Sequence, residues 1–179
     1  MDSERLPRTV TAVISGSKPT VGGRLGALAR IDMPWGAAQP SLPRFALATA
    51  VALAGSLLAC YLLAGAAQLL DPATRGYEHF RFADYGRLTA LSVLIACLAW
   101  PVVAWFSSQA RRVFLVLAVL VTLASFAPDV WIGIHGQPLA GVLTLVLMHV
   151  ALLVVTYPAL VLLAPQERIR ATAPLVPSP

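Results

Sequence analysis

The sequence predicts an all-α polytopic membrane protein with four transmembrane helices and both termini in the cytoplasm. Three observations predict this fold class. Of the 179 residues, 58% are hydrophobic and only 12% are charged, whereas soluble domains carry about 25% charged residues. The apolar residues form four long runs with nearly all the charges between them, and the mean hydropathy is +0.77. The basic residues are concentrated on one side of these runs. A soluble enzyme and a disulfide-stabilised scaffold are therefore excluded.

The first two apolar runs are long enough to cross a bilayer. Residues 45–70 provide 26 positions without a charge, and roughly 20 helical residues cross a hydrocarbon core of about 30 Å. Residues 88–106 provide 19, with Pro101 near the end of the run. A proline there bends the last turn of a membrane helix without abolishing it. Each run therefore predicts one transmembrane helix.

The third run is interrupted by Pro128 and Asp129. Residues 113–127 give 15 uncharged positions, and reading through to residue 134 gives 22. We favour the longer helix, with Pro128 as a kink, because a tight turn over residues 135–138 then joins it to the fourth run. That run, residues 139–164, has 26 residues with His149 near its middle.

The segments before the first run and after the last are predicted to be cytoplasmic tails. Residues 1–44 are basic and rich in Pro and Gly, without a sustained hydrophobic period. Such a segment cannot bury enough apolar surface to offset the entropy of ordering it, so we expect it to be mostly disordered. Translation from Met33 would remove most of it, and the sequence leaves both starts open. Residues 165–179 form a short C-terminal tail.

The distribution of basic residues sets the predicted orientation. Ten Lys and Arg residues lie on the side of the two termini and three on the other. The positive-inside rule therefore places both termini in the cytoplasm. On that side we expect Arg44, Arg111 and Arg112 to contact anionic lipid headgroups, at about 1 kcal/mol each.

Small residues and aromatic residues predict how the helices pack and where the membrane boundaries lie. Small-residue stripes are expected to bring helices together in lipid, within one bundle or at a dimer interface. They comprise Ala52, Ser56, Ala59 and Cys60 in the first run, and Thr89, Ser92, Ala96 and Ala99 in the second. Aromatic rings favour the headgroup level. Those expected at the outer boundary are Tyr77, Phe80, Phe82, Tyr85 and Trp131, and those at the inner boundary are Trp100, Trp105, Phe106, Phe114 and Tyr157.

One polar cluster is predicted on the last two helices. Thr122, Ser125 and Asp129 fall at i, i+3 and i+7 and so share one helix face. An aspartate in a membrane span costs roughly 2.5–3.5 kcal/mol on insertion scales and usually faces the bundle interior. Asp129 and His149 are therefore expected to meet there, in a proton relay or small-ligand site. The alternatives are a helix end at Asp129 and a packing role for His149.

No cofactor, metal or nucleic acid is expected. A bis-histidine haem site needs two intramembrane histidines, and the sequence gives His149 alone, with His79 and His135 assigned to loops. A structural zinc site needs about four Cys or His ligands, and no such cluster is present. Catalytic sequence motifs are absent, so we do not expect an enzyme. No basic stripe is interleaved with exposed aromatic residues.

Residues 88–164 resemble a family of small bacterial four-helix membrane proteins known only as a domain of unknown function. The resemblance rests on the stretch Ser125-Phe126-Ala127-Pro128-Asp129 and on the pair Met148-His149. It implies the same four-helix topology and supplies no catalytic residues.

The sequence therefore favours a non-enzymatic protein of the bacterial plasma membrane. The leading hypothesis is an accessory or scaffold subunit that binds lipid, a larger membrane partner or further copies of itself. The alternative is a small oligomeric transporter or proton-coupled permease that uses Asp129 and His149.

Overall fold

The structure, a computed structural model, describes residues 39–166, and all regular structure in that range is helical. The elements follow in the order α2 (Leu42–Leu70), the short 3₁₀ helices η1 (Pro72–Thr74) and η2 (Glu78–Phe80), α3 (Phe82–Phe106), α4 (Ala110–Ile134), α5 (Leu139–Pro158) and the π-helical turn η3 (Ala159–Leu163). Of the two predicted tails, 1–44 and 165–179, the parts up to residue 38 and from residue 167 lie outside the described residues, as does the alternative start at Met33.

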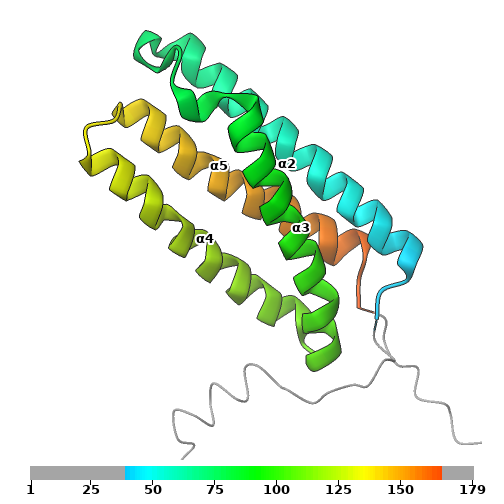
Figure 1. Ribbon diagram of the computed structural model, residues 1–179. Coiled ribbons are helices and arrows are strands. Elements are labelled where there is room, and N and C mark those ends of the chain that lie inside the picture. The colour runs from blue at the N-terminus through cyan, green and yellow to red at the C-terminus, as the bar shows by residue number, and fades with distance from the viewer. Residues whose placement is uncertain (1–38, 167–179) are drawn as a thin grey trace, which may run out of the picture.

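The four long helices form an up-down-up-down bundle (Figure 1). Helix α2 packs against α3 and α5, and α4 packs against the same two helices, so α2 and α4 occupy opposite corners. The most extensive contact joins α2 to α5 and η3, and α3 contacts α4 less extensively. We name the two ends of the bundle by one residue each. The Arg111 end holds the starts of α2 and α4, and the Asp129 end holds the starts of α3 and α5.

All four helices are long and apolar enough to cross a membrane, which confirms the predicted fold class. Large hydrophobic side chains are exposed on every one of them, among them Leu58, Leu98, Val121 and Val154. Lipid tails solvate such surfaces, and a helix satisfies its own backbone hydrogen bonds where no water is present. The outward faces are therefore suited to a bilayer.

The helix boundaries correct several predicted ones. Helix α2 begins at Leu42 rather than at residue 45, with Pro43 in its first turn, where its missing N–H is not needed. Helix α3 begins at Phe82, six residues before the predicted start, so Asp84 and Arg87 are helical rather than part of a loop. Helix α4 continues through Pro128 to Ile134, as predicted. The turn at residues 135–138 contains Gly136, whose φ of +85° favours glycine.

Small residues bring α2 close to its neighbours. Its buried positions recur every four residues at Ala48, Ala52, Ser56, Cys60 and Ala64. The Ser56 and Thr156 hydroxyls lie 3.2 Å apart and join α2 to α5 by a hydrogen bond. Beside them, a Cβ atom on Gly55 would lie only 2.8 Å from Val155 Cγ1. The predicted stripe of small residues therefore packs within the bundle.

The buried face of α3 differs from the predicted stripe of small residues. Thr89 is buried as predicted, and its hydroxyl donates to Cys60 Sγ of α2 at 3.7 Å. The remaining buried positions continue through Val93, Cys97 and Trp100, whereas Ser92 is exposed. The stripe prediction fails only at Ser92, since Ala96 and Ala99 are partly buried against the core. The buried face also includes a valine and a tryptophan, which a ranking by small size leaves out.

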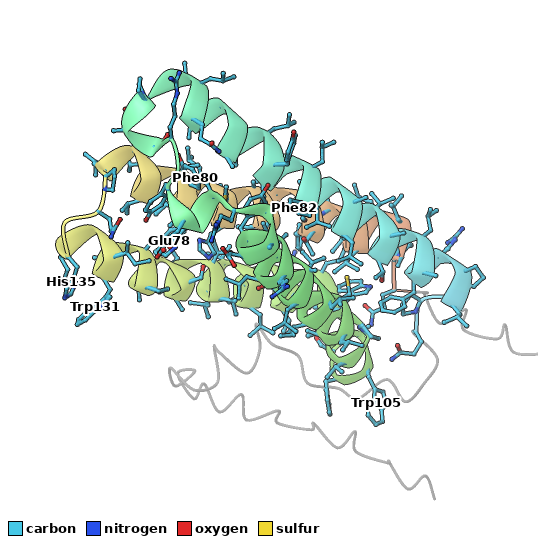
Figure 2. The ribbon with its side chains drawn as sticks, turned by 45° about the horizontal axis from the view of Figure 1, so that its top comes forward. Glu78, Phe80, Phe82, Trp105, Trp131 and His135 are labelled. Carbon is cyan, nitrogen blue, oxygen red and sulfur yellow. The ribbon has the colours of Figure 1, made fainter. Side chains whose placement is uncertain are left out.

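The aromatic side chains divide between the boundaries and the core. Trp131 and His135 lie at the Asp129 end, and Trp105 lies at the opposite end (Figure 2). Trp131 is 62% exposed and Trp105 is 44% exposed. By contrast, Trp100 is fully buried and donates through Nε1 to the Ala164 carbonyl at 2.8 Å. Phe80, Tyr85 and Phe114 are also buried, so their rings pack inside the bundle near its ends.

The close approach at Gly55 predicts a position-specific effect of adding one methyl group. Gly55→Ala should lower the stability of the bundle by about 1–3 kcal/mol, because the stiff Val155 side chain must move. Gly65→Ala, in the same helix, meets no atom within 4 Å. It should leave stability unchanged or raise it by up to about 1 kcal/mol through helix propensity. Thermal unfolding of both variants in one detergent is the measurement, and equal midpoints would contradict the prediction.

Candidate functional site

The candidate site is centred on a contact between Asp129 of α4 and His149 of α5. Nδ1 of His149 lies 3.0 Å from Oδ2 of Asp129. Asp129 stands five residues before the end of α4 and His149 ten residues after the start of α5, about 7.5 Å and about 15 Å from the Asp129 end. Helical side chains point toward their own N-terminus. In two antiparallel helices Asp129 therefore points deeper and His149 points outward, and the two meet between these levels.

The surroundings of the pair leave the carboxylate short of donors. Asp129 is 4% exposed, and Oδ2 accepts no well-formed hydrogen bond from residues 39–166. Nδ1 of His149 also lies 3.0 Å from the Leu145 carbonyl. A neutral imidazole has a single N–H, so at most one proton serves these two acceptors.

A cavity of about 420 Å³ extends from this pair along the bundle between α3, α4 and α5. Small-molecule sites in proteins are typically about 300–1,000 Å³. The lining is mostly apolar, and no described residue of α2 belongs to it. Its hydroxyl-bearing residues include Thr89, Ser92, Thr122, Ser125 and Thr156. Leu88, Ser92 and Val121, which also line it, are exposed on the seam between α3 and α4, so the cavity borders the surface that faces lipid.

Phe114 and Tyr157 line the cavity at the Arg111 end, Trp100 packs against Phe114, and we call these three rings the aromatic floor. Phe114 of α4 packs edge-on against Trp100 of α3, with ring centroids 5.2 Å apart. Phe114 also stacks on Tyr157 of α5 at 6.1 Å. Phe114 and Tyr157 are the last lining residues of their helices in this direction. The cavity therefore has a charged end at Asp129 and an apolar end at the floor.

The structure brings the four predicted residues to one cavity wall, with unequal roles. Asp129 and His149 are in contact, and Thr122 and Ser125 line the cavity on the same face of α4. Ser125 Oγ donates to the Thr122 carbonyl at 2.7 Å, so this hydroxyl hydrogen is committed to its own helix. Asp129 is not a helix end, since α4 continues past it.

Sequence reasoning missed two titratable residues of the cavity. His79, which was assigned to a loop, lines it from η2, and Asp84 lines it from α3. Helix η2 follows the chain reversal after α2, and Figure 2 shows Glu78 and Phe80 close to the start of α3. Extending α3 back to residue 82 would have found Asp84. No local pattern in the sequence could have placed His79.

Tyr77 packs over the start of α5 beside this end of the bundle. Its ring would lie 3.1 Å from a Cβ atom on Gly141, so glycine allows the close approach. The ring also contacts His79 and Phe80, with centroids 5.0 and 5.1 Å away. Burial, followed by the negative charges of Asp129 and Glu78, raises the pKa of the Tyr77 phenol. Its hydroxyl has no hydrogen-bond partner within the described range.

The three arginines predicted to contact headgroups lie at the Arg111 end. All three are exposed, Arg44 near the start of α2 and Arg111 and Arg112 near the start of α4. Arg111 has an additional contact, since its guanidinium donates to the Val161 carbonyl of η3 at 3.2 Å. This bond satisfies a carbonyl in the irregular π-helical turn and ties α4 to the end of the last helix.

Within residues 39–166, no group of three His, Cys, Asp or Glu side chains is placed to hold a metal ion. Comparisons with family models, curated proteins and solved structures give no match to the chain. The resemblance of residues 88–164 to the bacterial four-helix family therefore stays a prediction.

The unpartnered Tyr77 hydroxyl predicts different results for two substitutions. Tyr77→Phe should leave stability at neutral pH within about 0.5 kcal/mol of the unsubstituted protein, because no hydrogen bond is lost. Tyr77→Ala should cost about 1–3 kcal/mol, because the ring contacts disappear. Thermal unfolding in detergent measures both.

The same pair of variants gives a pH dependence. The folded-state pKa of Tyr77 is raised, so its contribution is complete below the unfolded value of about 10 and is lost as pH rises through the folded value. Tyr77→Phe should therefore lose less stability above about pH 10 than the unsubstituted protein. An identical alkaline loss would refute the raised pKa.

Proposed function

We propose that this chain is a non-enzymatic accessory or scaffold protein of the bacterial plasma membrane that binds a lipid or another amphiphile between α3, α4 and α5. The observation that carries the proposal is the cavity of about 420 Å³. It borders the exposed seam between α3 and α4, and its walls are mostly apolar. A molecule that resides in the bilayer has the chemistry to reach and fill it.

The aromatic floor favours binding over passage through the bundle. Phe114 contacts the rings of both Trp100 and Tyr157 at one end of the cavity. Tyr157 also donates a hydrogen bond to the Arg111 carbonyl, which fixes the floor to the start of α4. Rings packed in this way at one end of the cavity favour holding a ligand over a continuous path across the membrane.

In this proposal the Arg111 end faces the cytoplasm. Arg44, Arg111 and Arg112 are exposed there, and anionic headgroups of the inner leaflet attract such residues. The outward side of α4, with Val116, Leu120 and Leu123 exposed, is available to lipid, a larger membrane partner or a second copy of this chain.

A tryptophan placed in the cavity should displace its ligand. Ala118 lines the cavity, whereas Ala124 of the same helix is exposed and does not line it. Ala118→Trp should lower the occupancy of a co-purified amphiphile roughly tenfold, a loss of about 1.4 kcal/mol in binding. Ala124→Trp should retain it. Native mass spectrometry after extraction in mild detergent gives the bound mass and also the number of chains and partners.

The two variants separate cavity binding from surface lipid. Lipids bound to the outer surface should be retained by both variants, so they contribute equally to the two bound masses. If the unsubstituted protein and Ala118→Trp carry the same bound mass, the cavity does not hold the ligand and the proposed function is rejected.

A proton-coupled permease is a second candidate because Asp129 and His149 form a contact inside a membrane helix bundle. Ionisable groups at such depth are costly and commonly belong to proton or substrate pathways. The distance of 3.0 Å between Nδ1 and Oδ2 permits proton exchange between them. Proton passage through the bundle would then require the aromatic floor to open in each transport cycle.

This second candidate predicts loss of proton flux on removal of either titratable group. In vesicles with an internal pH dye, Asp129→Asn and His149→Ala should each lower flux roughly tenfold or more. Glu78→Gln, an exposed position outside the cavity lining, should not change it. If flux through the unsubstituted protein equals that of protein-free vesicles, the permease is rejected.

A further inference from the structure

We infer that the cavity selects a cationic amphiphile, such as a long-chain ammonium compound, with its positive head at Asp129 and its apolar body toward the aromatic floor. The inference rests on the proposed function and names its ligand class. It is carried by the charge of the cavity lining, by the state of the Asp129 carboxylate and by the separation of polar and apolar ends.

The lining carries carboxylates and no fixed positive charge. Asp84 and Asp129 contribute the acidic groups, His79 and His149 contribute the imidazoles, and no Lys or Arg belongs to the lining. The fixed charge that the lining residues bring to this end therefore comes from carboxylates and not from Lys or Arg. An anionic headgroup would meet two carboxylates there without a fixed cation to pair with, whereas an ammonium group is attracted.

The Asp129 carboxylate has acceptor capacity that the protein does not use. Asp129 lines the cavity, and its Oδ2 is buried and accepts no well-formed hydrogen bond from the described residues. The nearest donor, Nδ1 of His149, is shared with the Leu145 carbonyl. A carboxylate offers about four lone-pair sites, and leaving them unfilled in an apolar environment is costly. A cationic head in the cavity beside Asp129 supplies the positive charge that this carboxylate lacks.

The remainder of the cavity fits an apolar body of some length. From Asp129 to Phe114, α4 runs for 15 residues, or about 22 Å. Along this path the lining is mostly apolar, and it ends on the aromatic floor. Access is from lipid, through the seam where Leu88 and Val121 are each 67% exposed. Head and tail positions of the ligand are therefore fixed by opposite ends of one cavity.

The test compares three twelve-carbon probes that differ in their heads: dodecylammonium, dodecanol and dodecanoate. Binding to the full-length chain in zwitterionic nanodiscs at pH 7.5 is measured by calorimetry, with protein-free nanodiscs subtracted. Dodecylammonium should bind most tightly and dodecanoate most weakly. Asp129→Asn should weaken dodecylammonium binding about tenfold or more, the range for a hydrogen bond to a charged group, and should change dodecanol binding less than about threefold.

Matched variants keep the test interpretable. Asp71→Asn removes one negative charge at the same end of the bundle but outside the cavity lining, and asparagine can still accept the hydrogen bond from Ala73 N. It should leave all three affinities unchanged. If Asp129→Asn does not fold, Asp84→Asn at the exposed rim should weaken dodecylammonium binding selectively.

The outcomes separate this inference from the proposed function. Equal affinities for dodecylammonium and dodecanol, or tighter binding of dodecanoate, overturn the charge selectivity and leave amphiphile binding in place. Binding of none of the probes, together with an unchanged bound mass in Ala118→Trp, overturns both.

Discussion

The close contact between α2 and α5 is the constraint on which the arrangement of the other helices depends. Lipid tails solvate apolar side chains as well as a neighbouring helix does, so association relies on close packing and on hydrogen bonds between helices. Gly55 against Val155 and the Ser56–Thr156 hydrogen bond supply both at one level of the bundle. Helix α5 is thereby held against α2, and α3 and α4 meet across bulkier side chains. The cavity lies on this less closely packed side.

The Asp129–His149 contact gives the cavity its chemical polarity. A lone carboxylate inside an apolar bundle is costly, and the opposite tilt of side chains on two antiparallel helices brings an imidazole to it. One imidazole proton, shared with a backbone carbonyl, leaves the carboxylate incompletely solvated. A packing role and a binding role for His149 are therefore compatible. The histidine tethers the acid to α5, and the acid keeps acceptor capacity toward the cavity.

Local patterns predicted the helices well and the buried faces less well. The four spans follow from run length and from the need to satisfy backbone hydrogen bonds in lipid, so even the interrupted run through Pro128 was predicted correctly. The meeting of Asp129 and His149 follows from helical phase and antiparallel order. The burial of Trp100 was not predicted, because aromatic residues have two uses in a membrane protein. Some aromatic rings lie at the membrane boundary, and others fill the core. The Trp100 ring does the latter, because its indole N–H reaches the Ala164 carbonyl.

The sequence by itself determined that this chain has four membrane-length helices, how they follow one another, and that an acid and a histidine lie on neighbouring ones. These properties depend on hydropathy and periodicity, which are local. Only the tertiary structure decided which helices approach closely, that a cavity remains between α3 and α4, and that His79 and Asp84 join its charged end. The reason is physical. In lipid every helix face is nearly equally well solvated, so hydropathy does not distinguish a face that packs from one that stays free, and the shapes of the assembled side chains settle it.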